Sequence, residues 1–188
     1  PENWKLAVNN ENFRKSVVHA FNRMPALATS DRIDPESLKN NTITPNAFAS
    51  ASKDYTYYEG LAAYTDGDNF DEALAAEYKA AAIDELTAAG ATFPVKMLMC
   101  YNPTSANWAQ ECQVVEQQIE TVLGADYVDI IIQAGPETGF LGAIRRTGKY
   151  AFMKCNWGAD YADPETWTDP FSTDSSYSFI FKSTDPET

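Results

Sequence analysis

The segment that decides the fold class is residues 93–133, which read FPVKMLMCYNPTSANWAQECQVVEQQIETVLGADYVDIIIQ. Its beginning (93–100) and its end (127–133) are nearly continuous apolar runs, as expected for strands buried in a sheet. Between them, apolar residues recur at helical spacing over 105–122, from a capping serine to a closing Gly124. Because a strand, a helix and a second strand follow one another directly, the segment predicts a βαβ unit with parallel strands.

Helices are predicted on the N-terminal side of this unit. Residues 70–89 repeat apolar side chains at helical spacing, with Asn69 as the expected N-cap and Gly90 as the terminator. Residues 11–24 show the same spacing, and Pro25 is expected to stop that helix. The long stretch that separates the two helices shows no sustained period, so we expect only short elements there.

A shorter helix over 137–147 and a third strand over 149–157 follow the unit. Strands alternating with helices predict an α/β fold, with a mainly parallel or mixed sheet flanked by helices on both faces. In such sheets ligands bind beyond the carboxyl ends of the strands. Candidate ligand-binding groups are therefore expected in the loops after Cys100, Gln133 and Trp157.

Length and charge limit the possible functions. The 188 residues suit a single domain over 1–188. Asp and Glu number 27 against 14 Lys and Arg, and the formal net charge of -13 would repel phosphate backbones, so we expect no nucleic-acid partner. No run of residues approaches the roughly 18 apolar residues that span a bilayer.

The cysteines and the single histidine argue against metal and nucleophile chemistry. Cys100, Cys112 and Cys155 match neither a disulfide framework nor a zinc or redox signature, so we interpret them as small buried hydrophobes and expect no metal and no cofactor. His19 shares a predicted helix face with Lys15 and is expected to be solvated. Sites of the Ser-His-Asp or Cys-His kind are therefore not expected.

Aromatic and acidic side chains concentrate in residues 156–171, NWGADYADPETWTDPF, just past the third predicted strand. Ring faces can cover apolar side chains and attract a cation, and a carboxylate can pair with an ammonium group. This combination favours a cationic, amide-rich ligand. We expect Asp163, which precedes a proline, to shape a turn, and Trp108 and Trp167 to belong to the core.

A competing interpretation is enzymatic. Asp160 with Asp163 or Glu165 would be a carboxylate pair beside tryptophans, as in a glycoside hydrolase. The spacing is weak support, because acidic residues are abundant throughout the chain. We therefore expect no enzymatic activity.

The run Trp157-Gly158-Ala159-Asp160-Tyr161, followed by Asp163-Pro164, resembles the oligopeptide and dipeptide substrate-binding proteins of ABC importers, solute-binding family 5. Two further segments, 12–23 and 83–95, are similar to that family in order and spacing. The resemblance thus covers most of the chain. It implies a periplasmic-binding-protein-like lobe, namely part of the second lobe of a two-lobed protein.

The resemblance also implies a function and a site. Asp160 would pair with the α-amino group of a peptide ligand, with Trp157, Asn156 and Tyr161 beside it at the side-chain pockets. Arg145 and Lys154 would lie toward the ligand's carboxyl terminus. The family resemblance implies an extracytoplasmic, lipid-anchored, monomeric protein that presents peptide to membrane permease subunits. Members of this family also bind nickel chelates, oligosaccharides or opines, which leaves the ligand class open.

Overall fold

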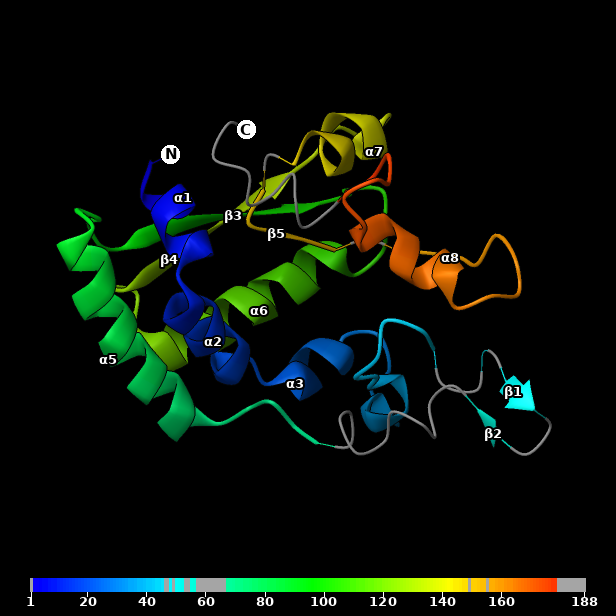
Figure 1. The fold of residues 1–188 in the computed structure, drawn as a ribbon, viewed down its shortest axis with the longest axis horizontal. Coiled ribbons are helices and arrows are strands. Elements are labelled where there is room, and N and C mark those ends of the chain that lie inside the picture. Colours follow the sequence, from blue (N-terminus) through cyan, green and yellow to red (C-terminus); the bar gives the residue numbers. More distant parts are fainter. Residues whose placement is uncertain are drawn as a thin grey trace.

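The computed structural model describes residues 2–45, 48, 50–52, 55–56, 67–148, 150–154 and 156–178. Figure 1 shows the arrangement of its elements. The α-helices are α1 (Glu2–Asn9), α2 (Glu11–Ala20), α3 (Arg23–Leu27), α5 (Glu72–Ala88), α6 (Trp108–Leu123), α7 (Phe140–Ala143) and α8 (Glu165–Thr168). The strands are β1 (Ser50–Ser52), β2 (Tyr55–Thr56), β3 (Val95–Tyr101), β4 (Val128–Ala134) and β5 (Phe152–Met153), and the 3-10 helices are η1 (Pro35–Leu38), η2 (Arg145–Thr147) and η3 (Asp169–Phe171).

The main sheet has three parallel strands in the order β4-β3-β5. Strands β3 and β4 pair from Val95 with Val128 to Tyr101 with Ala134, which confirms the predicted βαβ unit. The third strand is much shorter than predicted, since only Phe152 and Met153 pair with β3. After Met153 the chain makes other contacts: Lys154 pairs with Glu111 of α6, and Trp157 and the Asp160 backbone bond to Thr166 in α8.

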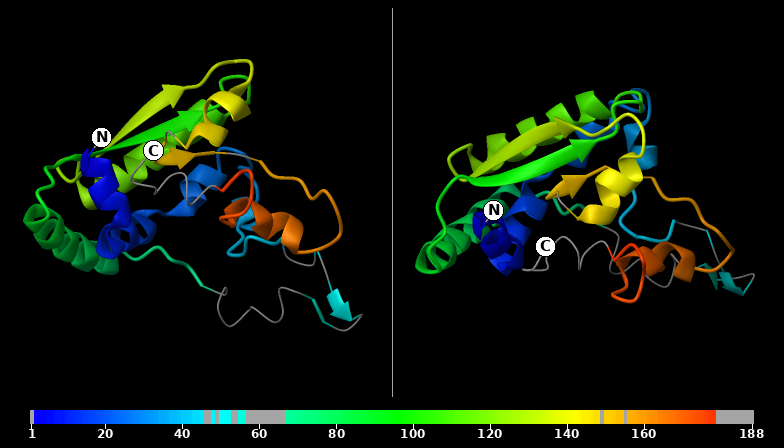
Figure 2. Two further views of the ribbon diagram at one scale, coloured as in Figure 1. Left: turned by 45° about the horizontal axis from the view of Figure 1, so that its top comes forward. Right: turned by 90° about the horizontal axis from the view of Figure 1, so that it is seen from above.

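Helix α6 covers one face of β3 and β4, and α2 and α5 pack beyond it, as Figures 1 and 2 show. Val95, Met97 and Ile130 are buried on that face. On the opposite face of β4, Ile131 is 41% exposed. Within the described residues, the predicted helix over 137–147 does not cover that face of β4, because the segment does not form one continuous helix.

That segment is broken into α7 and η2, which stay near the carboxyl end of β4. Gly139 and Gly148 flank the two short helices with φ angles of 71° and 68°, a conformation that glycine adopts without steric cost. Ile144 separates α7 from η2. The interruption keeps both helices too short to run back along the sheet.

Local capping explains the helix boundaries that differ from the prediction. Helix α5 begins after Asp71, not Asn69, because an Asp71 carboxylate oxygen accepts hydrogen bonds from the N–H groups of Ala73 and Leu74, both at 2.9 Å. At the other end Gly90 has a φ of 87°, as expected for a helix terminator. Gly124 ends α6 in the same way, with a φ of 88°.

The predicted helix over 11–24 is two helices. Helix α2 ends at Ala20, and the Asn22 side chain accepts a hydrogen bond from Met24 N at 3.0 Å to begin α3. Pro25 lies in the first turn of α3, where its missing N–H removes no intrahelical bond, so it does not act as a stop. Helix α6 likewise begins after Asn107, with a φ of 64°, and not at Ser105.

A single cluster of buried apolar residues joins the helices to the sheet. Tyr127 is central to it, with ring centroids 5.7 Å from Phe13 and 5.4 Å from Phe93. His19 is partly exposed, as predicted, but its ring also stacks on Tyr78, with centroids 5.5 Å apart. The stacking is possible because α2 packs directly on α5.

Cys100 and Cys112 are buried free thiols, as predicted. Burial raises the pKa of both, that of Cys112 to about 11. Cys155 and Lys149, the start of the predicted third strand, lie outside the described residues. Within the described ranges, none of the helices combines the length and the apolar character needed to cross a membrane.

Candidate functional site

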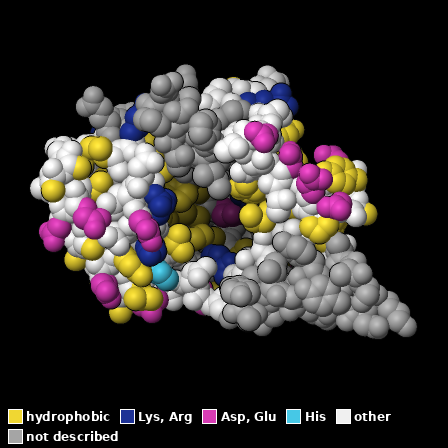
Figure 3. Space-filling view, viewed as in Figure 1, with side chains coloured by type: hydrophobic (Ala, Val, Ile, Leu, Met, Phe, Trp, Pro, Cys, Tyr) yellow, Lys and Arg dark blue, Asp and Glu magenta, His cyan; other side chains and the backbone are white. Residues whose placement is uncertain are grey.

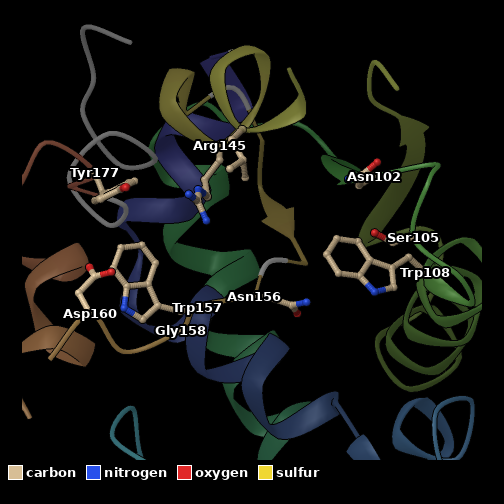
Figure 4. Close-up of a pocket in the computed structure, with 10 residues that line it drawn as sticks. Asn102, Ser105, Trp108, Arg145, Asn156, Trp157, Gly158, Asp160 and Tyr177 are labelled. Atoms are coloured by element: carbon tan, nitrogen blue, oxygen red, sulfur yellow. The ribbon is translucent and has the colours of Figure 1, made fainter. Parts of the chain in front are cut away.

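The segments that follow the three parallel strands line one open cavity of about 430 Å³. Figure 4 shows the residues around it. Those after β3 are Asn102, Ser105 and Trp108, those after β4 are Leu141 and Arg145, those after β5 are Asn156, Trp157, Gly158 and Asp160, and Tyr177 completes the lining. The cavity therefore lies where the sequence predicted ligand-binding groups, beyond the carboxyl ends of the strands.

Arg145 is the basic residue among the described residues of the cavity lining. Its side chain is held by two rings, with the guanidinium carbon 5.7 Å from the ring centroid of Trp157 and 5.2 Å from that of Tyr177. These two rings contact each other edge to face, with centroids 4.9 Å apart. Arg145 is only 5% exposed, and in Figure 4 its guanidinium points toward the middle of the cavity.

The loop that carries Trp157 and Asp160 is fixed by one buried residue. Thr166, which is 2% exposed, accepts a hydrogen bond from Trp157 Nε1 on its carbonyl oxygen at 2.7 Å. Its hydroxyl oxygen accepts a hydrogen bond from the backbone N–H of Asp160 at 3.0 Å. The ring and the acidic residue are thereby held at the cavity, while the Asp160 side chain stays exposed to solvent.

The outer side of this loop is acidic. Figure 3 shows acidic side chains gathered on the part of the surface that α8 occupies. Tyr161 is 50% exposed there and does not line the cavity. The pKa of Tyr161 is raised, mainly by desolvation and further by the nearby carboxylates of Glu165, Asp169, Asp163 and Asp160. This surface would attract a positively charged group toward the cavity.

Lys154, the second basic residue that the resemblance implied, has a different environment. It forms an ion pair with Glu111 of α6, and both side chains are largely buried. Its ammonium nitrogen also lies 5.4 Å from the ring centroid of Trp108. Lys154 is not among the residues that line the cavity. It instead contacts Trp108, which does line it.

Four of the six predicted ligand-contacting residues thus line the cavity: Arg145, Asn156, Trp157 and Asp160. Trp108 was expected in the core and lines it too. Sequence reasoning also missed Asn102 and Ser105, although they follow β3 directly and the strand-end rule could have found them. No sequence pattern pointed to Tyr177 as a cavity residue, because it lies in a long polar loop far along the chain.

Asp163 and Glu165, the candidate partners of Asp160 in a carboxylate pair, are not among the described residues of the cavity lining. Asp160 is the sole carboxylate among the described residues of the cavity lining. Asp163 accepts a hydrogen bond from Glu165 N at 2.9 Å, which confirms its predicted role in a turn. The described parts of the chain contain no cluster of three or more His, Cys, Asp or Glu side chains suited to a metal ion.

The sequence as a whole matches a known family. Residues 3–179 match the sequence model described as bacterial extracellular solute-binding proteins, family 5 Middle. The chain belongs to this family. The resemblance predicted from the run around Trp157 is thereby confirmed.

An oligopeptide-binding relative agrees with this assignment. The chain is 29% identical to the oligopeptide-binding protein AliB of Streptococcus pneumoniae over 190 residues, which cover 90% of this chain and 29% of that protein. The chain thus spans less than a third of that relative's length.

Solved structures confirm the periplasmic-binding-protein-like fold. The peptide-binding protein of a peptide ABC transporter aligns with a TM-score of 0.71 at 22% identity, over 94% of this chain and 72% of that one. The substrate-binding domain of an oligopeptide ABC transporter from Bacillus anthracis aligns with a TM-score of 0.67 at 20% identity, over 95% of this chain and 32% of that one.

Proposed function

We propose that the chain is the ligand-facing part of the second lobe of a two-lobed oligopeptide-binding protein, and that this protein captures peptides for an ABC importer without chemical catalysis. The observation that carries the proposal is the cavity at the three strand ends, with Asp160, Arg145 and the rings of Trp108, Trp157 and Tyr177 in its lining. A peptide offers an ammonium group, flat amides and apolar side chains, which match carboxylate, polar and aromatic surfaces in turn.

Membership of family 5 and the similarity to the oligopeptide-binding protein AliB support the same interpretation. The family's extracellular character supports an extracytoplasmic location. We propose that the full-length gene product is a lipid-anchored monomer that delivers peptide to membrane permease subunits, with ATP hydrolysis carried out by other subunits.

In this proposal the Asp160 carboxylate pairs with the α-ammonium of the peptide. Its backbone is fixed by Thr166 and its side chain is exposed at the cavity, so it can meet an incoming charged group. A partner lobe that closes over the peptide would exclude water from this charge pair. Removing one member of an enclosed pair leaves the other buried without compensation.

The test is calorimetry on the full-length gene product and its Asp160→Asn variant, with a free-amine peptide and its N-acetylated counterpart. We expect the substitution to weaken binding of the free-amine peptide by about 2 to 5 kcal/mol, roughly 30- to several-thousand-fold. Acetylation should weaken binding to the unaltered protein and matter much less in the variant.

Asp163→Asn is the matched control. It also removes one negative charge, but from a residue that lies three positions after Asp160 and shapes a turn. It should leave peptide affinity within about threefold. Equal affinities of the unaltered and Asp160→Asn proteins for both peptides would remove Asp160 from the site. Failure of the full-length protein to bind any peptide would overturn the proposed function itself.

A further inference from the structure

Glu111 and Lys154 form an ion pair beside the cavity but outside its described lining. Glu111 lies in the first turn of α6, and Lys154 is the residue that follows β5. The Glu111 side chain is 19% exposed and that of Lys154 25%, so water screens this pair less than it screens a pair on the open surface. The pair therefore fixes the first turn of α6 to the end of β5, across 43 positions of sequence.

The pair adjoins Trp108, the aromatic residue that α6 contributes to the cavity. Glu111 follows Trp108 by three positions, which places both side chains on one face of α6. The Lys154 ammonium nitrogen lies 5.4 Å from the ring centroid of Trp108, within the range over which a ring face attracts a cation. Since Trp108 lines the cavity and Lys154 does not, this contact holds the indole from outside the lining.

A second indole lies across the cavity. In Figure 4 the rings of Trp108 and Trp157 lie on two sides of the cavity, with Asn156 between them. The Trp157 ring is held by its hydrogen bond to the carbonyl oxygen of Thr166. Lys154 precedes Trp157 by three positions, so its pairing also ties the segment that leads to Trp157 to α6. Both indole rings are thus held by contacts within the protein.

Indole rings held in this way suit an aromatic side chain of a ligand. Aromatic rings attract one another in edge-to-face and offset arrangements, with centroids roughly 4.5–7 Å apart. Immobilising a side chain on binding reduces affinity, so a ring that is already ordered binds more tightly than a mobile one. Leu141 adds an apolar surface to the same lining. The interactions that order Trp108 therefore bear on which side chains the cavity accepts.

We propose that Glu111 and Lys154 are positioning residues for peptide binding, which hold the Trp108 indole as a fixed wall for an aromatic side chain of the peptide. The inference rests on the proposed peptide-binding function and adds a side-chain preference together with its structural cause. It gives Lys154 a role different from the contact with the ligand's carboxyl terminus that the family resemblance implied. Both residues act through Trp108, so their effect on binding depends on that ring.

The first experiment measures the preference by calorimetry on the full-length gene product. The probes are a free-amine, alanine-rich pentapeptide and its five variants with a single Phe, each made with a free and with an amidated carboxyl terminus. We expect Phe at one position to strengthen binding by roughly 10-fold or more relative to Ala. Trp108→Ala should remove most of that gain.

The second experiment tests the ion pair with the Phe peptide so identified and its Ala counterpart. Lys154→Met and Glu111→Gln each remove one charge with little change of size. Each should weaken the Phe peptide by roughly 3- to 10-fold and the Ala peptide by less than about twofold. In a Trp108→Ala background the same substitutions should change neither affinity by more than about twofold, because no ring remains to be positioned.

Lys96→Met is the matched control for Lys154→Met. It makes the same chemical change at an exposed residue of β3 that does not line the cavity. It should leave the affinities for both peptides within about twofold. Melting curves of every variant check that the protein is folded at the temperature of the titrations.

Four outcomes contradict the inference. The first is equal affinity for Phe and Ala peptides at all five positions, which would leave the proposed peptide-binding function intact. The second is an equal loss for both peptides in Lys154→Met, and the third is an undiminished loss in the Trp108→Ala background; either would indicate a general structural role. The fourth is a loss that amidation of the peptide abolishes, which would place Lys154 at the ligand's carboxyl terminus. Failure of every peptide to bind the unaltered protein would overturn both proposals.

Discussion

Gly135 is a residue whose missing side chain matters for the cavity. It follows β4, and its N–H donates a hydrogen bond to Tyr101 O at 2.9 Å. A Cβ atom at this position would lie 2.6 Å from Cδ2 of Phe140 and 3.2 Å from Cγ1 of Ile144, closer than packed atoms allow. Phe140 is buried and begins α7, which leads directly to Arg145. Close packing at Gly135 thus supports the position of the arginine.

Gly135→Ala is expected to destabilise the fold by about 1 to 3 kcal/mol, because the ring of Phe140 must move away from the added methyl group. The measurement is the free energy of unfolding from urea titrations. Gly142→Ala is the matched control, since a Cβ at that position meets nothing within 4 Å and alanine favours the helix. It should change stability by no more than about 1 kcal/mol, in the favourable direction. Similar stabilities for the two variants would contradict the packing argument.

Charge pairing between distant residues is the part of the site that the sequence could not supply. Arg145 and Lys154 look alike as basic residues near the aromatic loop. The structure separates them by position: Lys154 pairs with Glu111, 43 residues earlier, and is not among the residues that line the cavity, whereas Arg145 lies against two rings in the cavity lining. A single sequence carries no information about such pairings, which depend on how the strands align.

At the scale of elements, capping by Asp71 decides where α5 begins. Its carboxylate accepts two backbone N–H groups that would otherwise lack a partner in the first turn. Asp71→Ala should therefore lower the free energy of unfolding by about 1 kcal/mol. Asn69→Ala, at the cap predicted from sequence, should change it by less than about 0.5 kcal/mol. Urea titrations of both variants check this, and a larger loss for Asn69→Ala would show that Asn69 is the true cap.

Elements with strong periodicity were predicted well from the sequence. Strands β3 and β4 are nearly continuous apolar runs, and helices α5 and α6 have long apolar stripes that end at Gly90 and Gly124, so their existence and order are as predicted. The segment between β4 and β5 and the residues after β5 were predicted poorly. The hydrophobic pattern there is compatible with one helix followed by a long strand. Two glycines in the left-handed region flank the two short helices that form instead, and hydrogen bonds to Thr166 hold the residues that were predicted to extend the strand.

At the scale of the molecule, the cavity is open on one side, and the chain spans about 29% of the length of AliB. Tight sites bury most of a ligand's surface, roughly 70–90% for small ligands. We therefore expect the isolated 188-residue chain to bind peptides more weakly than about 1 mM, even where the full-length product binds tightly. Calorimetry on the isolated chain tests this, with a melting curve to show that it is folded. A micromolar dissociation constant would contradict this expectation and show that the isolated chain encloses enough of a peptide to bind it tightly.

The location of the site was predictable from topology, because parallel strands place their carboxyl ends at one edge. The loop after Trp157 was identified for that reason, and the cavity lies there. The shape of the cavity was not predictable. Trp108 and Tyr177 enter it from segments that the pattern assigned to a helix and to a loop, and only the folded arrangement brings them to Arg145.

The cavity lining extends from Asn102 to Tyr177, so its walls are assembled from residues up to 75 positions apart. Such a site has no counterpart in the unfolded chain, because none of its short segments contains both charges and the rings. A peptide that occupies it binds the native state alone and shifts the folding equilibrium by mass action, by about 2.7 kcal/mol at a hundred times its dissociation constant. If the protein binds peptides as proposed, ligand capture and protection against unfolding are the same thermodynamic event, and a loaded protein should outlast an empty one wherever unfolded chains are degraded.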